Sequence, residues 1–256
     1  MSSGKDYVFP YERPRAGQLN LVNAILNFSS QSPIIIVNAP TGFGKTVSIL
    51  YSAIKIVERG DVGRILYIVR TRNELDPVIK EARRIGIDFT VVYSGKRMCP
   101  YAMGRSISSE GFWTICSILR LKGRCPYYNR VATRSTSTIK RIVSGSEDHF
   151  TIAKNLFSKA GVCPYFTLLS LSEEVPLTIA TYPYLFKERI LLSALPHIDP
   201  SETLVIMDEA HNIANIGGIM GESIEVRAIN AAIEEIREFK QEEKEVIDAL
   251  SALSMI

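Results

Sequence analysis

Residues 42–46 place glycine, lysine and threonine in an order that could bind phosphate groups. The segment reads GFGKT, and an apolar run, Ile34–Val37, precedes it. Glycine lets the backbone approach a ligand closely and adopt positive φ, and backbone N–H groups at the start of a helix bind anions. In such a loop the lysine reaches the terminal phosphates of a nucleotide, and the threonine hydroxyl binds Mg²⁺. The sequence therefore predicts a buried strand, a phosphate-binding loop and a helix in succession.

This loop departs from the usual pattern at its first position, where Ala39 stands in place of glycine. The remaining spacing fits, and a strand pattern before it and a helical pattern after it support the interpretation. The alternative is a glycine-rich connection that carries an ordinary surface lysine. The residues assigned to nucleotide binding are Ala39, Pro40, Thr41, Gly42, Phe43, Gly44, Lys45 and Thr46.

An acidic pair at the end of a later apolar run is the second candidate for chemistry. Residues 203–211 read TLVIMDEAH, and ligands of open α/β folds bind at the carboxyl ends of parallel strands. We expect Asp208 to hold Mg²⁺ through water and Glu209 to orient or deprotonate an attacking water, with Lys45 as the third catalytic residue. His211 would report the state of the site to neighbouring elements. The alternative is an Asp-Glu helix cap, which is common.

The four cysteines of the chain are all in one segment, residues 95–163. They are Cys99, Cys116, Cys125 and Cys163. Four thiols match the ligand count of a tetrahedral zinc ion or of a [4Fe–4S] cluster. The short Cys-x₂₋₄-Cys spacing of zinc ribbons is absent, and wide, irregular spacing suits a cluster held by loops and short helices. Disulfides and plain buried thiols remain as alternatives.

The same segment is rich in basic residues and poor in acidic ones over most of its length. Between Lys96 and Arg141 the sequence has ten Lys or Arg residues and one acid. Cations that neutralise phosphates, together with aromatic rings that stack on bases, bind single strands without sequence preference. Lys96 and Arg97 are the best candidates for phosphate or strand-junction contacts. The aromatic residues Tyr101, Trp113, Tyr127 and Tyr128 could stack on bases or pack around a metal group, and a solvated basic surface is the alternative.

Strand and helix patterns alternate on both sides of this segment. Strands are expected at 34–37, 64–69, 89–93, 177–180 and 203–207, and helices at 15–27, 45–58 and 76–85. Such alternation predicts an α/β fold, a mostly parallel sheet with helices on both faces. From residue 222 onward the chain is acidic and helical in pattern, with an apolar stripe that contains Ile229, Ile233, Ile236 and Phe239.

Composition places this chain among ordinary globular proteins. It has 256 residues, 46% hydrophobic and 22% charged, with a net charge of +3. The start of the sequence has no apolar stretch typical of a secretory signal, and no apolar run is long enough to span a membrane. We therefore expect an intracellular protein with reduced cysteines.

The two halves of the nucleotide site, with the DEAH sequence, resemble superfamily-2 helicases. Arg15 and Gln18 look like the Arg-x-x-Gln that precedes the phosphate-binding loop in these enzymes. Residues 70–75, RTRNEL, look like the motif that holds the DNA backbone. The resemblance thus adds Arg15 and Gln18 to the nucleotide site and assigns Arg70 and Thr71 to DNA binding.

Within that superfamily the chain resembles the XPD helicases, most of all their archaeal members. The resemblance is carried by CPYFTLL and TIATYPYLF between residues 163 and 186, by DEAHNI, and by the four-cysteine insert. It implies a P-loop, RecA-like parallel sheet from residues 1–94 and 164–220. It also implies a [4Fe–4S] insert over 95–163 and the start of a truncated, helical arch-like insert over 221–256. Tyr182 and Tyr184 would then belong to the DNA-binding residues.

The function implied by this resemblance is ATP-dependent, 5′→3′ DNA unwinding, with a place in DNA repair. Expected ligands and partners are ATP, Mg²⁺, a [4Fe–4S] cluster, single-stranded and forked DNA, and repair-complex proteins. The second motor domain of the family is not in this chain, so weak or no unwinding is expected from the chain alone. Localisation would be cytoplasmic in an archaeon or bacterium and nuclear in a eukaryote. The alternatives are a nucleotide-switched DNA- or protein-binding module and a zinc-stabilised P-loop ATPase.

Overall fold

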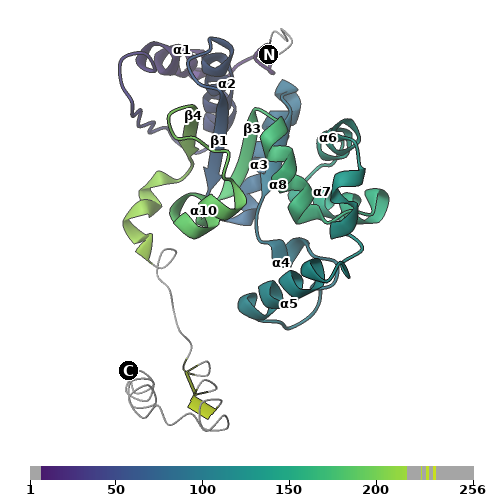
Figure 1. The fold of residues 1–256 in the computed structure, drawn as a ribbon. Helices are drawn as coiled ribbons and strands as arrows, with labels where there is room; N and C mark the ends of the chain where they lie inside the picture. Colours follow the sequence, from purple (N-terminus) through teal and green to yellow (C-terminus); the bar gives the residue numbers. More distant parts are fainter. Residues whose placement is uncertain (1–6, 218–225, 227–228, 231–232, 235–256) are drawn as a thin grey trace. The chain divides into compact units, whose positions relative to one another are not determined.

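Four parallel strands form the sheet around which residues 1–214 are built (Figure 1). They are β1 (Arg64–Val69), β2 (Phe89–Val92), β3 (Leu177–Thr181) and β4 (Thr203–Met207), in the order β2-β3-β1-β4. The central strand β1 pairs with β3 and β4, so that Ile65 lies opposite both Leu177 and Leu204. The strands predicted over these four segments are confirmed, and β1 is almost wholly buried, as a central parallel strand must be.

The structure is a computed structural model, and it describes residues 7–217, 226, 229–230 and 233–234. The chain divides into two compact units, residues 1–214 and 215–256. Most of the predicted helical segment 221–256 lies outside the described residues, including Ile236 and Phe239 of its apolar stripe. Ile229 and Ile233 are described, and both are helical and buried.

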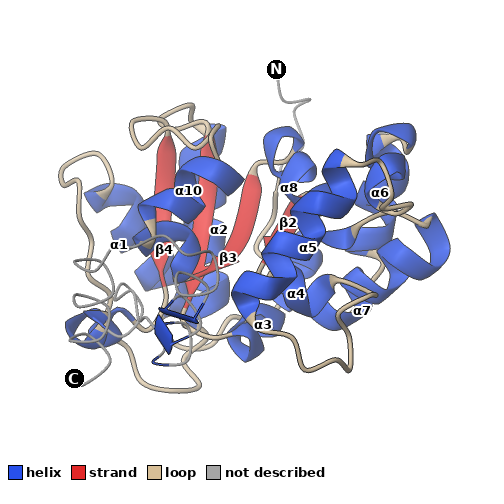
Figure 2. Ribbon diagram, turned by 60° about the horizontal axis from the view of Figure 1, so that its bottom comes forward, coloured by secondary structure: helices blue, strands red, loops and turns tan. Residues whose placement is uncertain are grey.

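Helices cover both faces of the sheet (Figure 2), as the alternation predicts. Helix α2 (Lys45–Glu58) packs against β1, and α3 (Leu75–Ile85) packs against β3. The apolar residues of α3 recur at helical spacing, and Val78, Ile79 and Ala82 are completely buried. The helix ends at Gly86, whose φ of 80° is the left-handed conformation that glycine adopts without strain.

Further helices lie before and after these elements. Helix α1 (Gln18–Phe28) packs against α2, and the 3₁₀ turn η1 (Arg72–Glu74) leads into α3. After the cysteine segment come α8 (Pro164–Glu174), α9 (Pro183–Phe186) and α10 (Glu188–Ala194), and η4 (Ala210–Asn215) follows β4. Helix α8 packs against β2, and α9 against β3.

The segment from Gly95 to Cys163 has no strand, and it divides into two parts. The first part holds α4 (Gly95–Met98), α5 (Ser109–Leu121) and the 3₁₀ helix η2 (Tyr128–Thr133). The second part holds α6 (Thr136–Ser144), α7 (His149–Asn155) and the π-helix η3 (Leu156–Ala160). Because α6 packs against β2 and α7 against α3, this second part belongs to the packing around the sheet.

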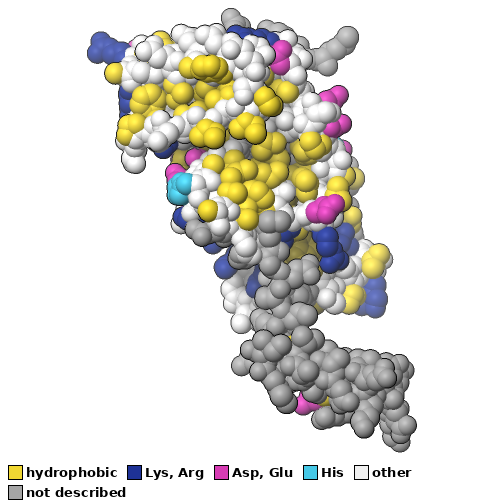
Figure 3. All heavy atoms as spheres, turned by 90° about the vertical axis from the view of Figure 1, so that its left-hand side faces the viewer, with side chains coloured by type: hydrophobic (Ala, Val, Ile, Leu, Met, Phe, Trp, Pro, Cys, Tyr) yellow, Lys and Arg dark blue, Asp and Glu magenta, His cyan; other side chains and the backbone are white. Residues whose placement is uncertain are grey.

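The prediction of a buried strand at residues 34–37 is wrong in this structure. These residues form an extended segment without strand pairing, and Ile34 and Ile36 are 74% and 90% exposed. The outer edge of β4 also has no strand partner among the described residues, and Val205 is 40% exposed. Hydrophobic side chains gather on the face that Figure 3 presents, the side on which this segment and α10 lie in Figure 1. An apolar run of this length forms a strand only where a neighbouring strand pairs with it and buries it.

None of the helices in the described part of the chain combines the length and the apolar character needed to cross a lipid bilayer.

Candidate functional site

The predicted phosphate-binding loop lies directly before α2, as its composition requires. Gly42 and Gly44 have φ of 82° and 88°, the left-handed conformation that makes this tight turn possible. The Phe43 N–H donates to Pro40 O at 3.3 Å, and the Lys45 ammonium donates to Ala39 O at 2.9 Å. Helix α2 begins at Lys45, so its free N–H groups point towards the loop. The loop is thus folded around its own lysine in a form that can bind an anion.

Arg15 and Gln18 contact the backbone of this loop from the start of α1. The Arg15 guanidinium donates to Gly42 O, and the Gln18 amide donates to Gly44 O at 3.4 Å. Gln18 is only 3% exposed, and a side chain at position 44 would meet its amide nitrogen at 2.0 Å. Glycine at position 44 therefore suits the positive φ of this turn and leaves room for the Gln18 amide. These contacts place the two predicted residues beside the loop.

The acidic pair lies in a turn at the carboxyl end of β4. The Asp208 N–H donates to Ile68 O at 2.9 Å, and the Glu209 N–H donates to the Asp208 carboxylate at 3.0 Å. Burial raises the pKa of Asp208, and the neighbouring Glu209 charge adds to this rise, whereas the hydrogen bonds to the carboxylate oppose it. Glu209 is exposed and has a φ of 52°, and no other non-glycine residue in the described chain has a positive φ.

Tyr67 joins the two halves of the nucleotide site. It lies in β1, is 1% exposed, and its hydroxyl donates to the Asp208 carboxylate at 3.2 Å. Burial raises the pKa of Tyr67 well above its ordinary value, as do the Asp208 and Glu209 charges, and a hydrogen bond with the Thr46 side chain opposes this rise. One buried hydroxyl therefore contacts side chains from both the phosphate-binding loop and the acidic pair. Thr46 and Asp208, the predicted Mg²⁺ ligands, are thus brought to the same place.

His211 lies on the solvent side of this site. Its side chain is 73% exposed, its Nδ1 atom is 3.3 Å from the Glu209 carboxylate, and the Asn212 amide lies 3.1 Å from its Nε2 atom. His211 can therefore respond to the position of Glu209, in line with its predicted role.

Arg70 and Thr71 lie at the end of β1, and both are exposed. Their N–H groups donate to the Glu74 carboxylate at 2.9 and 3.1 Å, and Thr71 forms a reciprocal capping box with Glu74. The Arg70 guanidinium also donates to the Asn212 side chain at 3.1 Å. The predicted DNA-binding segment is thus connected to the acidic turn through one side-chain contact.

Tyr182 and Tyr184, in contrast, are buried. Tyr182 is 0% exposed, and its hydroxyl donates to Asp208 O at 2.8 Å and lies 3.1 Å from Glu209 O. Tyr184 is 5% exposed, and its hydroxyl donates to Tyr93 O at 2.8 Å. This burial contradicts the prediction of direct DNA contact by either ring. A tyrosine can stack on a base at the surface, or it can be buried with its hydroxyl bonded to one acceptor. The sequence does not distinguish these two situations.

Lys96 and Arg97 are neighbours in α4 but have different surroundings. The Lys96 ammonium donates to Ile107 O and is partly buried, so it holds the loop before α5. Arg97 is exposed. Of the two, Arg97 is the better placed for contact with a phosphate.

All four cysteines line one small cavity of about 20 Å³ in the first part of the cysteine segment. Cys99 follows α4, Cys116 lies in α5, Cys125 follows α5, and Cys163 precedes α8. They are free thiols, each partly exposed. The rest of the lining includes Gly95, Pro100, Tyr101, Phe112, Trp113, Arg120, Tyr127, Tyr128, Tyr165 and Phe166. The aromatic rings pack on one another, as in the Tyr101–Tyr127 pair at 5.5 Å, which favours packing over base stacking.

The charge around this cavity fits a group that binds thiolates. Burial raises the pKa of the Cys163 thiol to about 12, and burial followed by the other thiols raises the pKa of Cys99 and Cys116 less strongly. The Arg120 guanidinium opposes the rise at Cys116. Arg120 Nε is buried without a hydrogen-bond partner in the described structure, although its cationic plane lies over the Phe166 ring at 4.5 Å. A partly buried cation beside four thiols is suited to an anionic thiolate-bound group.

The four sulfur atoms do not converge on a single point. Within the described residues, no group of three or more His, Cys, Asp or Glu side chains is close enough to hold one metal ion. A zinc ion would need each sulfur within about 2.3 Å of the same centre.

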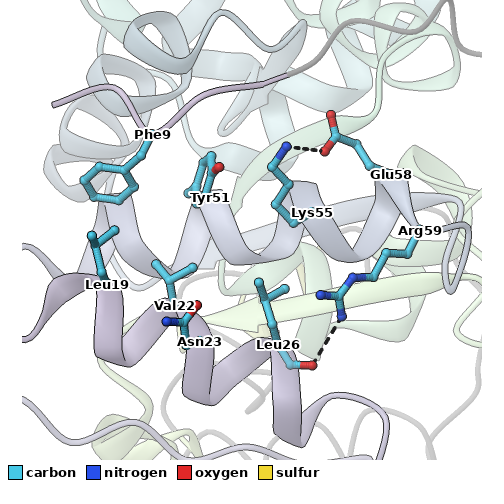
Figure 4. A pocket seen from close by; sticks show the side chains of 9 residues that line it. All are labelled: Phe9, Leu19, Val22, Asn23, Leu26, Tyr51, Lys55, Glu58 and Arg59. Atoms are coloured by element: carbon cyan, nitrogen blue, oxygen red, sulfur yellow. Dashed lines mark hydrogen bonds and ion pairs between the residues drawn. The ribbon is translucent and has the colours of Figure 1, made fainter. Parts of the chain in front are cut away.

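A larger groove of about 390 Å³ lies between α1 and α2 (Figure 4). Its lining includes Phe9, Leu19, Val22 and Tyr51, with the Lys55–Glu58 ion pair at 2.8 Å along one side. None of the predicted site residues lines this groove. The groove is therefore separate from the nucleotide site.

Two residues of the site, Tyr67 and Arg120, are not among the sequence predictions, and a third, Tyr182, is predicted for a different role. Tyr67 and Tyr182 contact the acidic pair from segments that are distant in the chain, whereas Arg120 lies four residues after Cys116 in α5. The available signal was a tyrosine within or directly after an apolar strand, since a buried Tyr hydroxyl normally finds a hydrogen-bond partner. The sequence could not specify which partner.

The sequence of this chain matches the model of one protein family. The model of the family DEAD_2 matches residues 67–230, more than half of the chain. Among curated proteins, the ATP-dependent DNA helicase XPD of Sulfolobus acidocaldarius is 25% identical over 241 residues, covering 92% of this chain. The human regulator of telomere elongation helicase 1 is 26% identical over 250 residues, covering 80% of this chain. The chain spans only 39% and 20% of the lengths of these two relatives.

Solved structures show the same fold. A structure named XPD helicase aligns with a TM-score of 0.64 and 22% identity, covering 95% of this chain and 40% of its own. A structure named truncated XPD aligns with a TM-score of 0.59 and 22% identity, covering 91% of this chain and 63% of its own. The α/β fold with a parallel sheet is therefore shared with XPD structures.

Proposed function

Because this chain belongs to the DEAD_2 family, we propose that it is the first motor domain of an ATP-dependent DNA helicase of the XPD type. The observation that carries the proposal is the Tyr67 hydroxyl, which donates to the Asp208 carboxylate at 3.2 Å and lies near Thr46, at the start of α2. A phosphate-binding loop alone indicates only nucleotide binding. A carboxylate pair beside the loop supports hydrolysis of the bound nucleotide as well.

In the proposed mechanism the loop and Lys45 hold the phosphates. The Lys45 ammonium exchanges Ala39 O for phosphate oxygens, and the N–H groups at the start of α2 donate to the same anion. Thr46 and Asp208 would hold Mg²⁺, which lowers the charge on the terminal phosphates. Glu209, exposed beside them, orients a water molecule for in-line attack and accepts its proton. His211 and Arg70, through Asn212, connect this turn to the surface.

DNA binding is assigned to Arg70 and Thr71 at the end of β1, and to the basic segment that starts with Arg97. The exposure of these residues supports this assignment. Their cations and hydroxyl contact the phosphate backbone, so binding is independent of base sequence. Movement in the 5′→3′ direction and a role in DNA repair inside the cell, with repair proteins as partners, complete the proposal.

Cys99, Cys116, Cys125 and Cys163 would hold a [4Fe–4S] cluster. Their position around one cavity and the unpartnered Arg120 Nε support the assignment. When bound, the cluster would supply iron–thiolate bonds that cross-link the turn after α4, helix α5 and the start of α8.

The test of the motor proposal is single-stranded-DNA-stimulated ATP hydrolysis by the complete helicase. Lys45→Ala and Asp208→Asn each should lower kcat at least 100-fold, because each removes charge stabilisation of the transition state. Lys80→Ala is the control, since Lys80 is an exposed lysine on α3. Hydrolysis that survives Lys45→Ala would contradict the proposal. ATP-dependent partner binding without hydrolysis would instead favour a nucleotide-switched binding module.

The cluster is tested separately by the metal and sulfide content of anaerobically purified protein. About four iron and four inorganic sulfide per chain are expected for a [4Fe–4S] cluster. One zinc per chain would leave a zinc-stabilised ATPase and remove the cluster from the proposal.

A further inference from the structure

Tyr182 occupies the junction between three parts of the motor fold. It directly follows β3 and begins α9, and its side chain is 0% exposed. Its N–H donates to Val69 O at 2.9 Å, at the end of β1. Its ring packs edge-on against Phe186, with centroids 5.3 Å apart. The residue is therefore held by β1 at one end and by α9 along its ring.

The hydroxyl of Tyr182 reaches the acidic turn. It lies 2.8 Å from Asp208 O and 3.1 Å from Glu209 O, two successive carbonyl groups. The N–H of Asp208 donates to Ile68 O, and the N–H of Tyr182 donates to the next carbonyl group along β1, Val69 O. Two neighbouring carbonyl groups of β1 thus hold the acidic turn and the tyrosine that contacts it.

Glu209 needs such support. Its φ of 52° is a conformation that a residue with a side chain rarely adopts, and it persists only where surrounding contacts hold it. Glycine would adopt this φ without strain, but residue 209 is a glutamate, so its backbone is strained. The backbone conformation sets the direction in which the Glu209 side chain leaves its Cα atom, and so the region that its carboxylate can reach.

We propose that Tyr182 is a positioning residue for ATP hydrolysis, which holds the backbone of the Asp208–Glu209 turn so that the Glu209 carboxylate faces the attacking water. The inference rests on the proposed function. It replaces the DNA contact expected of this tyrosine from the sequence. It concerns the step after nucleotide binding, since Tyr182 contacts neither the phosphate-binding loop nor its lysine.

The neighbouring Tyr184 provides a matched control. It lies two residues later in α9, is 5% exposed, and donates a hydrogen bond of the same 2.8 Å length, but to Tyr93 O. Tyr184 also contacts the Tyr165 hydroxyl at 3.4 Å. Tyr182→Phe and Tyr184→Phe each remove one tyrosine hydroxyl with a 2.8 Å bond to a backbone carbonyl group, and only the first of these hydroxyls contacts the acidic turn. The experiment measures kcat and the KM for ATP in the complete helicase, together with the Tm of each variant.

The expected result is a kcat about tenfold lower for Tyr182→Phe, with KM for ATP unchanged and a Tm similar to that of Tyr184→Phe. Equal kcat values for the two variants would overturn the inference and give Tyr182 a purely structural role. A wild-type protein without ATP hydrolysis would instead overturn the proposed function. If Tyr182→Phe does not fold, Phe186→Leu shifts the same ring without removing its hydroxyl. It should lower kcat with an unchanged KM, and an unchanged kcat would again overturn the inference.

Discussion

Tyr67 places one hydroxyl between two side chains that the sequence separates widely. It donates to Asp208 Oδ2 at 3.2 Å, and the Thr46 side chain lies near it. Both partners are proposed to hold Mg²⁺, directly or through water. Partners of this kind fix the orientation of a metal ligand, and their removal commonly lowers metal affinity 10- to 100-fold.

Tyr67→Phe should therefore raise the Mg²⁺ concentration needed for half-maximal nucleotide binding by about tenfold. A fluorescent ATP analogue titrated at a series of Mg²⁺ concentrations gives this value. Tyr93→Phe is the control, since Tyr93 is equally buried but its hydroxyl contacts His149 O, away from the nucleotide site. An unchanged Mg²⁺ requirement in Tyr67→Phe would show that Thr46 and Asp208 are positioned without this hydroxyl.

At the scale of elements, the cysteine segment is built from helices, and α5, α6 and α7 each begin with a side-chain cap. Asp148 begins α7, and its carboxylate accepts from the Thr151 N–H at 2.7 Å and from the Thr151 hydroxyl at 2.9 Å. Burial alone raises the pKa of Asp148, but these hydrogen bonds outweigh it and hold the pKa below its ordinary value. A carboxyl group whose pKa is lower in the folded than in the unfolded protein stabilises the fold at pH values above its unfolded pKa. This stabilisation is lost as the pH falls through its folded pKa.

Asp148→Ala should lower the free energy of unfolding by about 1 kcal/mol at pH 7. The difference from wild type should persist down to about pH 4, near the ordinary carboxyl pKa, and shrink below it. Urea unfolding at pH 7, 5 and 3 measures this. Ser108→Ala, which removes the cap of α5 at Gly111 N, is the control with no titrating group. A loss in Asp148→Ala that is equal at all three pH values would exclude the charged cap as its cause.

The elements also show where sequence patterns were sufficient. The helix at 45–58 and the strands at 64–69 and 203–207 follow from local periodicity, and the structure has the same bounds. The segment 34–37 has an equally apolar pattern, yet it lies outside the sheet, because strand pairing depends on a neighbour that no local pattern specifies. The role of Tyr182 is not predicted for the same reason, since its hydroxyl contacts a backbone carbonyl group 26 residues away. The P-loop and acidic residues were identifiable because their chemistry needs residue types at fixed spacing.

At the scale of the whole molecule, charge is distributed unevenly. The net charge is only +3, yet ten of the 30 Lys and Arg residues lie between Lys96 and Arg141, with a single acid among them. Exposed cations in a group attract a polyanion by releasing the counterions bound to it, and this attraction weakens as salt concentration rises. Lys96 donates to Ile107 O whereas Arg97 is exposed, so the two adjacent cations should contribute differently to DNA binding.

Arg97→Ala should reduce the slope of log Kd against log salt for a single-stranded oligonucleotide by about 1, the effect of losing one phosphate contact. Lys96→Ala should leave this slope nearly unchanged and lower the Tm instead, because its ammonium group already bonds to the protein. Fluorescence anisotropy at several salt concentrations, with Lys80→Ala as an exposed control, measures the slopes, and thermal unfolding measures the Tm. Equal slopes for Arg97→Ala and wild type would remove Arg97 from the DNA-binding surface. A slope change in Lys96→Ala would mean that its bond to Ile107 O gives way to a phosphate when DNA binds.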